Sequence, residues 1–559
     1  MKKTISILVP FVVITVVAYG QSIFYVTTSG SDSNDGKSWE TAFADVQTAI
    51  DAAYAVATDE NPSEVWIAAG TYKHGSSLTM KNNVVIYGGF YGNESKRPEI
   101  FNVENKTILC GENNYTVIKN IYTSEKPLTN SAKLFNCVIS EGYGDTGGGM
   151  YNNNATPDIY NCTFRNNAAI KGGAIYGSIS LLYNCKFENN VVSSRKERSF
   201  GGALYGNFTV KRCTFTNNCA FSSYYSYGGA IYSSDTEVIE SEFVSNSANE
   251  GGGIYLSASP DSKISGCLFF KNSANSGSAI SNYHSHPIIE NCTIVENGTM
   301  AVLNFNDSNP LIVNCTFSKN GNYAIYNSMP ATPVILNCIF WDDGEEISSS
   351  DYQSKSVVHS IIKGGYDGVN ISSEDPLLGE LGNYGGYTRT IPINRDSPAI
   401  GLGLQHRSAP LFDARGIYRK SNPCIGAYEY IGSTKYENWA LSNKLENSNQ
   451  YLDTTPFNDG ITNIEKFAFG LSGNKAASYA ENALFKQSYA DGKACFQFPI
   501  SKDAADSVNV KVMTSEDLVN WTEAPSASIG TSGDFNLMQT EQTVPEGGKL
   551  FFKLVVEEK

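Results

Sequence analysis

Few residues in this chain combine a reactive type with a spacing that could do chemistry. Asp342 and Asp343 are the acid pair best suited to general acid and base catalysis. They come at the end of a repeat, so a solvated turn is the better interpretation. His284 and His286 could place two imidazoles on one face of an extended strand, as a metal pair would require. No third ligand lies nearby in sequence, so we favour a surface loop before Pro287, predict no metal site and leave the catalytic residues unassigned.

A row of tyrosines is the feature best suited to binding. Five tyrosines follow an inward-facing apolar position in successive repeats, so the alternation of a strand turns them outward. They are Tyr151, Tyr176, Tyr205, Tyr232 and Tyr255. Stacked on one face, their rings could form a strip for sugar rings, which favour flat aromatic surfaces. The alternative is structural: the rings would stabilise the coil by stacking on each other, or would be covered by a loop such as 191–200.

These residues belong to a repeated framework between Leu134 and Trp341. A short phrase ending in cysteine returns about every 25 residues, with Ser241 in one of its positions. The cysteines are Cys137, Cys162, Cys185, Cys213, Cys267, Cys292, Cys315 and Cys338. A second phrase, Gly-Gly-Ala-Ile-Tyr at 172–176, is interleaved with the first and echoed three times. Self-similarity at this period indicates a stacked repeat architecture.

The residues around each cysteine predict how one coil is shaped. Apolar residues stand three before the cysteine and usually two after it, and these positions cannot all face inward on one flat strand. The coil must therefore bend just before the cysteine. Six of these positions hold asparagine, which tolerates the left-handed conformation; they are 136, 161, 184, 291, 314 and 337. We expect these asparagines to stack along one corner of the coils. The architecture that fits is a parallel β-helix, because the leucine spacing of leucine-rich repeats is absent and the content of Gly, Asn and β-branched residues argues against helical repeats.

The chain has twelve cysteines, eight of which occupy the same repeat position. Coils about 4.8 Å apart bring such residues within reach of a disulfide. In-register parallel neighbours nevertheless point their Cβ atoms the same way, which strains the bridge. We therefore predict a ladder of buried, reduced thiols that pack as small apolar side chains. No Cys-x-x-Cys pair is present to hold a metal.

Length, charge and the N-terminus indicate an exported protein. At 559 residues the chain exceeds one compact core. Residues 1–20 read as a signal peptide, with Lys2 and Lys3 before an apolar run from 5 to 17 that is too short to span a bilayer. After its cleavage we expect no transmembrane segment and a secreted or cell-surface protein, at a bacterial outer surface. The net charge of −15 argues against a nucleic-acid partner.

The remaining organisation follows from composition. Residues 21–125 predict an N-terminal cap, with one amphipathic helix, and the first coils. Residues 126–432 predict the β-helix and a closing segment, 433–480 a partly helical linker, and 481–559 a small β-sandwich with alternating runs. A cap is expected because the first coil would otherwise expose an unpaired strand edge.

Several of these phrases resemble known families. The Phe-x-Asn-Asn phrases at 164–167, 187–190 and 215–218, together with Gly-Gly-Ala-Ile, resemble the repeats of chlamydial polymorphic outer-membrane proteins. More broadly they resemble right-handed β-helix proteins of the pectin-lyase-like superfamily. The segment from Glu374 to Glu429 resembles the closing segment of bacterial choice-of-anchor Q proteins. These resemblances imply a right-handed parallel β-helix and export, and they imply no activity.

The resemblance also defines what a catalytic relative would need. β-Helix hydrolases that cut pectin use clustered acids with a Gly-His-Gly sequence, which this chain lacks. β-Helix lyases use a Lys or Arg base with calcium held by acids. Arg165 and Lys186 are single candidates for such a base, and no acid cluster stands beside them.

We therefore predict an all-β protein: a right-handed parallel β-helix with an N-terminal cap and a small C-terminal β-sandwich. The expected function is adhesion or polysaccharide binding without catalysis and without a cofactor, with a polysaccharide or cell-surface glycan as partner. The alternative is a polysaccharide lyase or glycosidase acting in the groove of the helix, with calcium as cofactor if it is a lyase. A purely structural surface rod is a third alternative.

Overall fold

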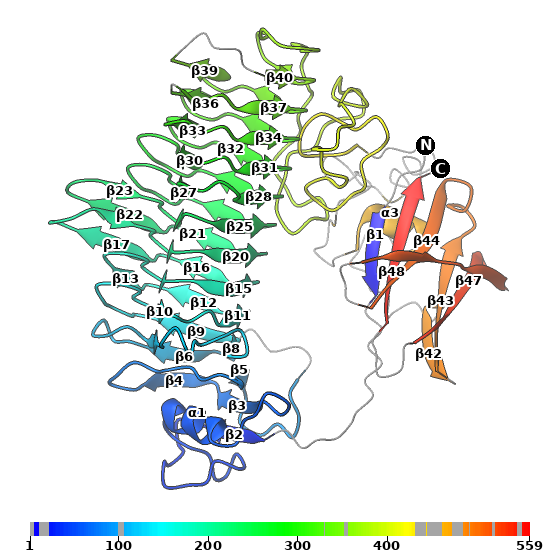
Figure 1. Ribbon diagram of the computed structural model, residues 1–559. Coiled ribbons are helices and arrows are strands. Elements are labelled where there is room, and N and C mark those ends of the chain that lie inside the picture. Colours follow the sequence, from blue (N-terminus) through cyan, green and yellow to red (C-terminus); the bar gives the residue numbers. More distant parts are fainter. Residues whose placement is uncertain are drawn as a thin grey trace.

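The computed structural model confirms this fold class (Figure 1). A right-handed parallel β-helix forms the long body, and antiparallel sheets form a smaller C-terminal part. The structure describes residues 5–9, 22–98, 105–328, 330–350, 356–430, 443, 455, 461–471, 484–490, 492–516, 520–544 and 550–558.

Three long parallel sheets form the walls of the β-helix, and each coil adds one strand to each sheet along most of the rod. Sheet 1 consists of β2 (Ile23–Val26), β3 (Ser63–Ala68), β5 (Val84–Phe90), β8 (Lys133–Phe135), β11 (Asp158–Tyr160), β15 (Ile179–Tyr183), β20 (Phe208–Lys211), β25 (Thr236–Ile239), β28 (Lys263–Ser265), β31 (Ile288–Glu290), β34 (Leu311–Val313), β37 (Val334–Leu336) and β40 (Ser356–Val358). Sheet 2 consists of β4 (Gly70–Lys73), β6 (Thr107–Cys110), β9 (Cys137–Ser140), β12 (Thr163–Arg165), β16 (Lys186–Glu188), β21 (Thr214–Thr216), β26 (Glu242–Val244), β29 (Leu268–Phe270), β32 (Thr293–Val295), β35 (Thr316–Ser318), β38 (Ile339–Trp341) and β41 (Ile361–Ile362). Sheet 3 consists of β7 (Ile118–Ile121), β10 (Met150–Asn153), β14 (Ile175–Tyr176), β19 (Leu204–Tyr205), β24 (Ile231–Ser233), β27 (Ile254–Ser257), β30 (Ile280–Tyr283), β33 (Met300–Phe305), β36 (Tyr323–Asn327) and β39 (Ile347–Ser349).

Identical side chains stack along the interior because successive coils pair in register. Phe164 pairs with Phe187, and Phe187 with Phe215, with ring centroids 5.3 and 4.7 Å apart. The cysteines of the repeat phrase are buried, and all twelve cysteines are free. Burial raises the pKa of Cys137 to about 12. The predicted ladder of buried cysteines is confirmed, and their reduced state stays a prediction.

The corner between sheets 1 and 2 bends at the predicted asparagines. Asn136, Asn161 and Asn184 have φ of 57°, 53° and 52°, in the left-handed region. The Asn184 amide donates to Asn161 at 2.8 Å. Further along the rod, Asn291 and Asn314 donate to carbonyl oxygens of the closing segment. Asn337 donates both to such a carbonyl, at 2.9 Å, and to Asn314, at 3.4 Å, so the corner ladder is only partly formed as predicted.

A second row of asparagines, which we call the amide ladder, runs inside the corner that follows sheet 2. Its seven members are fully or almost fully buried: Asn167, Asn190, Asn218, Asn246, Asn272, Asn297 and Asn320. Each side-chain amide donates to a backbone carbonyl of the preceding coil and, in all but Asn320, to the side-chain oxygen of the next asparagine; for Asn218 these acceptors are Phe187, at 2.9 Å, and Asn246, at 3.0 Å. Buried amides satisfied in this way fix the register of the coils.

Glycine is required where coils approach most closely. A Cβ atom on Gly229 would lie 2.2 Å from the carbonyl oxygen of Gly252 in the next coil. In the same way, a Cβ atom on Gly202 would lie 2.0 Å from the carbonyl oxygen of Gly229. The repeated Gly-Gly phrase therefore reflects backbone packing between coils.

Helix α1 (Val46–Tyr54) caps the first coil, as predicted (Figure 1). The Asp45 side chain accepts a hydrogen bond from the backbone N–H of Thr48 at 2.9 Å, which satisfies the helix N-terminus. Val46, Ala49 and Ile50 are buried in the same core as the β-helix interior.

A lobe projects from the side of the β-helix between sheets 2 and 3 (Figure 1, left). It contains two small parallel sheets, whose strands are β13 (Ala168–Ala169), β17 (Val191–Ser194) and β22 (Cys219–Ser222) in one and β18 (Ser199–Phe200) and β23 (Ser226–Tyr227) in the other. These strands continue the stacking of the coils outward.

The closing segment, residues 373–430, packs against the corner between sheets 1 and 2. The Arg389 guanidinium binds Glu242 of β26 at 2.8 Å, and Thr390 lies 2.8 Å from Thr293 of β32 through their hydroxyl oxygens. Buried ion pairs hold the segment together, including Arg415 with Asp413 at 2.5 Å.

Two antiparallel sheets form the C-terminal part and share one apolar core. One contains β42 (Lys486–Ala490), β43 (Lys493–Ser501), β47 (Phe535–Thr543) and β46 (Ala527–Ser532); the other contains β1 (Ile5–Val9), β48 (Phe551–Glu558), β44 (Val508–Ser515) and β45 (Thr522–Ala524). Helix α3 (Asn463–Ala468) and Ile417 of the closing segment pack into the same core. The rest of the predicted linker lies almost entirely outside the described residues. Residues 5–9 of the predicted signal peptide form β1, and cleavage of that peptide stays a prediction.

Candidate functional site

The five predicted tyrosines lie together on the outer face of sheet 3. Tyr151 pairs in register with Tyr176, Tyr176 with Tyr205, Tyr205 with Tyr232, and Tyr232 with Tyr255. Each follows a fully buried residue of its strand, so the pleat turns the tyrosine outward. We call this row the tyrosine strip. The structure brings all five residues together as the repeat period predicts.

The rings of the tyrosine strip stack face to face. Successive ring centroids are 5.5, 5.0, 5.1 and 5.4 Å apart, with interplanar angles between 5° and 13°. Stacking at this distance occupies the ring faces within the row. Because the hydroxyl lies opposite the Cβ atom, each ring directs its rim and hydroxyl away from the sheet. The strip therefore presents a row of phenol rims, and Tyr151, whose neighbour in the preceding coil is Lys119, keeps one face that no ring of the row covers.

The lobe covers the later part of the tyrosine strip. Phe200 contacts Tyr205 and Tyr232 edge-on, at 5.9 and 5.0 Å between centroids, and Tyr227 contacts Tyr255 at 4.9 Å. Tyr255 is only 5% exposed, and burial raises its pKa. The strip is therefore most accessible at its N-terminal end, and both structural roles weighed for these rings, mutual stacking and cover by a loop, are present.

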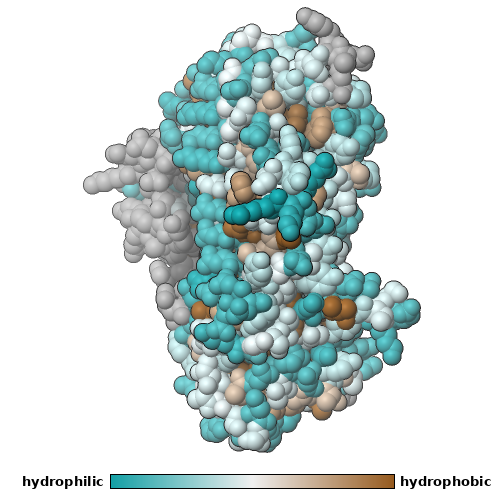
Figure 2. All heavy atoms as spheres, turned by 90° about the vertical axis from the view of Figure 1, so that its left-hand side faces the viewer, coloured by the Kyte–Doolittle hydropathy of each residue, from teal (hydrophilic) through white to brown (hydrophobic). Residues whose placement is uncertain are grey.

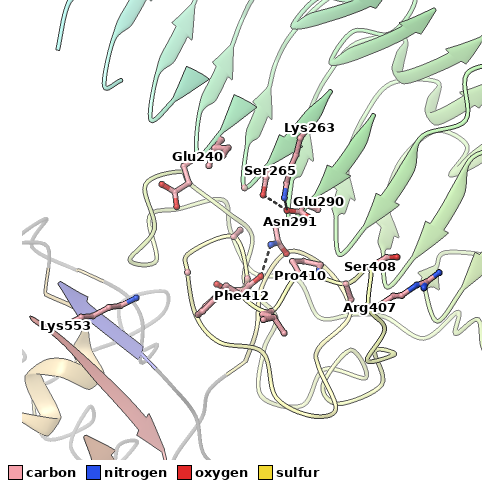
Figure 3. A pocket seen from close by; sticks show the side chains of 17 residues that line it. Glu240, Lys263, Ser265, Glu290, Asn291, Arg407, Ser408, Pro410, Phe412 and Lys553 are labelled. Atoms are coloured by element: carbon pink, nitrogen blue, oxygen red, sulfur yellow. Dashed lines mark hydrogen bonds and ion pairs between the residues drawn. The ribbon is translucent and has the colours of Figure 1, made fainter. Parts of the chain in front are cut away.

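A cavity of about 600 Å³ lies between sheet 1 and the closing segment (Figure 3). Lys263, Ser265 and Glu290 point into it from β28 and β31. Glu290 binds the Lys263 ammonium at 2.8 Å and accepts from the Ser265 hydroxyl at 2.9 Å. Asn291 donates to the carbonyl oxygen of Phe412 at 2.8 Å across the cavity. These contacts join the closing segment to the β-helix and engage the Glu290 carboxylate.

Another charged group around this cavity, Glu240, is engaged in an ion pair, and one lysine reaches the cavity from the C-terminal part of the chain. Glu240 binds Arg212 at 2.7 Å, and the Arg212 guanidinium lies 3.3 Å from the ring centroid of Tyr387. Lys553 reaches the cavity from β48, and burial lowers its pKa. Among the described residues that line the cavity there is no pair of opposed free carboxylates, and the contacts above favour a structural joint over an acid and base site.

The structure places the two acids of the pair Asp342 and Asp343 in different environments. Asp342 is exposed, has φ of 65° and binds Lys363 at 2.6 Å, so the predicted solvated turn is confirmed for it. For Asp343 the prediction is wrong. Its carboxylate ends the amide ladder by accepting from the backbone and side-chain amides of Asn320, at 2.6 and 2.8 Å. Burial and the neighbouring carboxyl of Glu346 raise the pKa of Asp343 well above its ordinary value.

The remaining candidates are a pair of histidines and two basic residues. His284 and His286 are exposed on either side of buried Ser285, and His284 has φ of 48°, which breaks the strand alternation that a metal pair would need. Within the described residues, no group of three or more His, Cys, Asp or Glu side chains could hold a metal ion. Arg165 and Lys186 lie on adjacent strands of sheet 2, with Glu188 the partner of Arg165 in register.

Sequence reasoning missed the aromatic and basic residues at the end of the lobe. Phe221, Tyr224 and Tyr225 are among the most exposed large apolar side chains in the described chain, and residues 195–198 are all exposed beside them. Their signal in the sequence is a longer interval between cysteines, 28 residues from Cys185 to Cys213, which makes room for the projecting loops.

Comparison with known protein families gives two matches. Residues 230–378 match the family described as right handed beta helix region, and residues 161–178 and 212–234 match the Chlamydia polymorphic membrane protein repeat. These stretches include Tyr176, Tyr232 and Tyr255 of the tyrosine strip. No curated protein and no solved structure matches the chain. The likeness to the pectin-lyase-like superfamily and to choice-of-anchor Q proteins stays a prediction. Among the described helices, none is long and apolar enough to cross a membrane.

Proposed function

We propose that this protein is a cell-surface polysaccharide-binding or adhesion protein without catalytic activity. The observation that carries the proposal is the tyrosine strip, a straight row of phenol rims on a rigid sheet. The match to repeats named for chlamydial membrane proteins supports a place at the outer surface. The acidic charge of the chain fits a glycan partner better than a nucleic acid.

The geometry of the strip suits an extended glycan that lies along the rod. Its tyrosines repeat at 5.0 to 5.5 Å, so their hydroxyls can donate to and accept from hydroxyls that recur along a sugar chain. Within the described residues, the hydroxyls of Tyr151, Tyr176, Tyr205 and Tyr232 make no hydrogen bond with another protein group, whereas Tyr255 is buried beneath Tyr227 of the lobe and lies outside the proposed binding surface. Because stacking already fixes the rings, little side-chain entropy is lost when a ligand binds. The uncovered face of Tyr151 adds a place for one sugar ring.

The test removes the hydroxyls and keeps the rings. In the variant Tyr151→Phe/Tyr176→Phe/Tyr205→Phe/Tyr232→Phe, stacking is retained and the melting temperature should stay near that of the wild type. Each lost hydrogen bond is worth about 0.5–1.5 kcal/mol, so glycan-array binding should fall at least about tenfold. Tyr255→Phe is the matched control, because its side chain is buried and should not contact the ligand. Unchanged binding by the fourfold variant would remove the strip from the binding site.

The same polymers distinguish a binder from an enzyme. Acidic and neutral polysaccharides are incubated with the protein, with and without calcium, and assayed for new reducing ends and for unsaturated products. We expect neither product. Either product would replace the proposal with the alternative of a polysaccharide lyase or glycosidase that acts in the groove of the helix, and calcium dependence would point to the lyase.

A further inference from the structure

The end of the lobe is a rigid platform, which we call the lobe tip and define as residues 195–198 and 221–225. Two loops from consecutive coils lie one on the other there. The Ser222 hydroxyl donates to the carbonyl oxygen of Glu197 at 2.7 Å, across the two loops. The Ser194 hydroxyl oxygen accepts from the backbone N–H of Glu197 at 3.1 Å. These hydrogen bonds hold the backbones of the two loops in place before any partner binds, which lowers the entropy cost of binding.

Three aromatic side chains at the lobe tip are open to solvent. Phe221, Tyr224 and Tyr225 are 60%, 65% and 47% exposed. Only Tyr225 stacks on another ring of the lobe, Tyr227, at 5.9 Å. The rings of the tyrosine strip cover each other, whereas those of the tip leave faces free. Exposed aromatic side chains that gather on a projecting surface mark a binding site more often than a surface without function.

The lobe tip is also basic on an acidic protein. Arg195, Lys196 and Arg198 are exposed, and Glu197 is the one acid among residues 195–198 and 221–225, so the tip carries three positive charges and one negative charge. Outside the tip, Glu250 lies close enough to Arg198 for this guanidinium to oppose the rise in the Glu250 pKa that burial causes. The chain as a whole carries −15. Charges more than about 10 Å apart in water are largely screened at moderate salt. A projecting tip therefore attracts anions although the body repels them. Figure 2, which faces this side of the molecule, shows strongly hydrophilic and apolar side chains next to each other in the middle of the face.

Aromatic contacts connect the lobe tip to the tyrosine strip. Tyr225 stacks on Tyr227, and Tyr227 stacks on Phe200 at 5.5 Å. Phe200 in turn contacts Tyr205 and Tyr232 of the strip. A long polymer with a sugar ring in every unit can contact this row of aromatic residues from the lobe tip to the tyrosine strip. A partner of this kind is therefore favoured over a folded acidic protein.

From these observations we infer that the lobe tip is a docking site for an anionic polysaccharide, whose carboxylate or sulfate groups bind Arg195, Lys196 and Arg198 while its sugar rings stack on Phe221 and Tyr224. The inference rests on the proposed function for the identity of the ligand as a glycan. It adds a second site and a chemical class of ligand.

The experiment measures binding of the full chain to polygalacturonate, dextran sulfate, poly-L-glutamate and neutral dextran by affinity electrophoresis at low and high salt. One variant removes the charges of the tip, Arg195→Gln/Lys196→Gln/Arg198→Gln. Its control removes three exposed lysines elsewhere, Lys96→Gln/Lys126→Gln/Lys319→Gln, and so changes the net charge equally.

A second pair of variants tests the rings. The first, Phe221→Ala/Tyr224→Ala/Tyr225→Ala, removes the exposed rings of the tip. Its control is Tyr54→Ala, at the end of α1, because this ring is 52% exposed and lies near the ammonium of Lys81. All of the altered side chains are exposed, so circular dichroism should show unchanged folding for the variants and their controls.

The expected result is that both tip variants weaken binding of an anionic polymer at least tenfold at low salt, with the two controls within twofold of the wild type. Preference for polygalacturonate or for dextran sulfate identifies the anionic group. The inference is overturned if the lysine control weakens binding as much as the tip variant, if the tip variants bind like the wild type, or if poly-L-glutamate binds as tightly as polygalacturonate. Retained binding of neutral dextran in any of these cases leaves the proposed function intact. No binding of any polysaccharide by the wild type overturns both.

Discussion

The amide ladder should be the most sensitive part of the β-helix to a single substitution, and Asn246→Ala tests this. The Asn246 side-chain oxygen accepts from the backbone and side-chain amides of Asn218, both at 3.0 Å. Its side-chain amide donates to the carbonyl oxygen of Phe215 at 2.9 Å and to Asn272 at 3.0 Å. The residue is fully buried, so water does not replace these partners without a cavity opening.

The size of the effect follows from the groups left without partners. Alanine at 246 orphans two donor hydrogens of Asn218 and the carbonyl oxygen of Phe215. At about 1–2 kcal/mol for each buried unpaired group, the free energy of unfolding should fall by roughly 3–6 kcal/mol. This is a large share of the stability of a typical domain.

The assay is equilibrium urea unfolding followed by circular dichroism, with Asn217→Gly as the matched control. Asn217 is exposed and directly precedes Asn218, the residue that donates to Asn246, and its φ of 55° suits glycine. We expect the control to lose less than about 1 kcal/mol. Coils of a repeat protein can unfold in stages, so the midpoint and the slope are compared as well. A loss of less than about 1 kcal/mol for Asn246→Ala, or an equal loss in the control, would refute the role assigned to the ladder.

Two further predictions follow from the burial of titratable side chains. Because burial raises the pKa values of Asp343 and Glu346, their contribution to stability is full below the unfolded-state pKa of about 4 and is lost as pH rises through the raised values. Asp343→Asn extends the amide ladder from Asn320 by one residue. In thermal melts the variant should therefore be more stable than the wild type at neutral and alkaline pH, and the difference should vanish in acid. A difference that does not depend on pH would contradict this prediction. For the thiols, brief iodoacetamide treatment of the native protein should label Cys219 and Cys495, which are half-buried, before the ten buried cysteines; peptide mass spectrometry showing equal labelling would contradict the thiol ladder.

Much of the β-helix could be predicted from the sequence because stacking repeats the same physical constraint in every coil. Period-two alternation and the cysteine phrase placed the inward residues, and asparagine before the cysteine located the left-handed corner. The sequence did not distinguish the two classes of asparagine. Asn161 and Asn167 are the same residue type six positions apart, yet one is exposed at a corner and the other is buried in the amide ladder.

The candidate site was predictable only in part. The repeat period placed the five tyrosines in one row, but it could not show that their faces are occupied by each other. Cover by Phe200 and Tyr227 depends on how far two long loops project, which local pattern does not encode. The same loops place Phe221 next to residues 195–198, a juxtaposition between consecutive coils that sequence distance conceals.

Glycan recognition without turnover is the property on which both proposed binding sites depend. Affinity electrophoresis of the wild-type chain through gels containing polygalacturonate, dextran sulfate or dextran, with the length of each polymer measured before and after, tests it most directly. We predict retardation in at least one polysaccharide gel and polymers of unchanged length. Equal mobility in every gel, or shortened polymers, would contradict it.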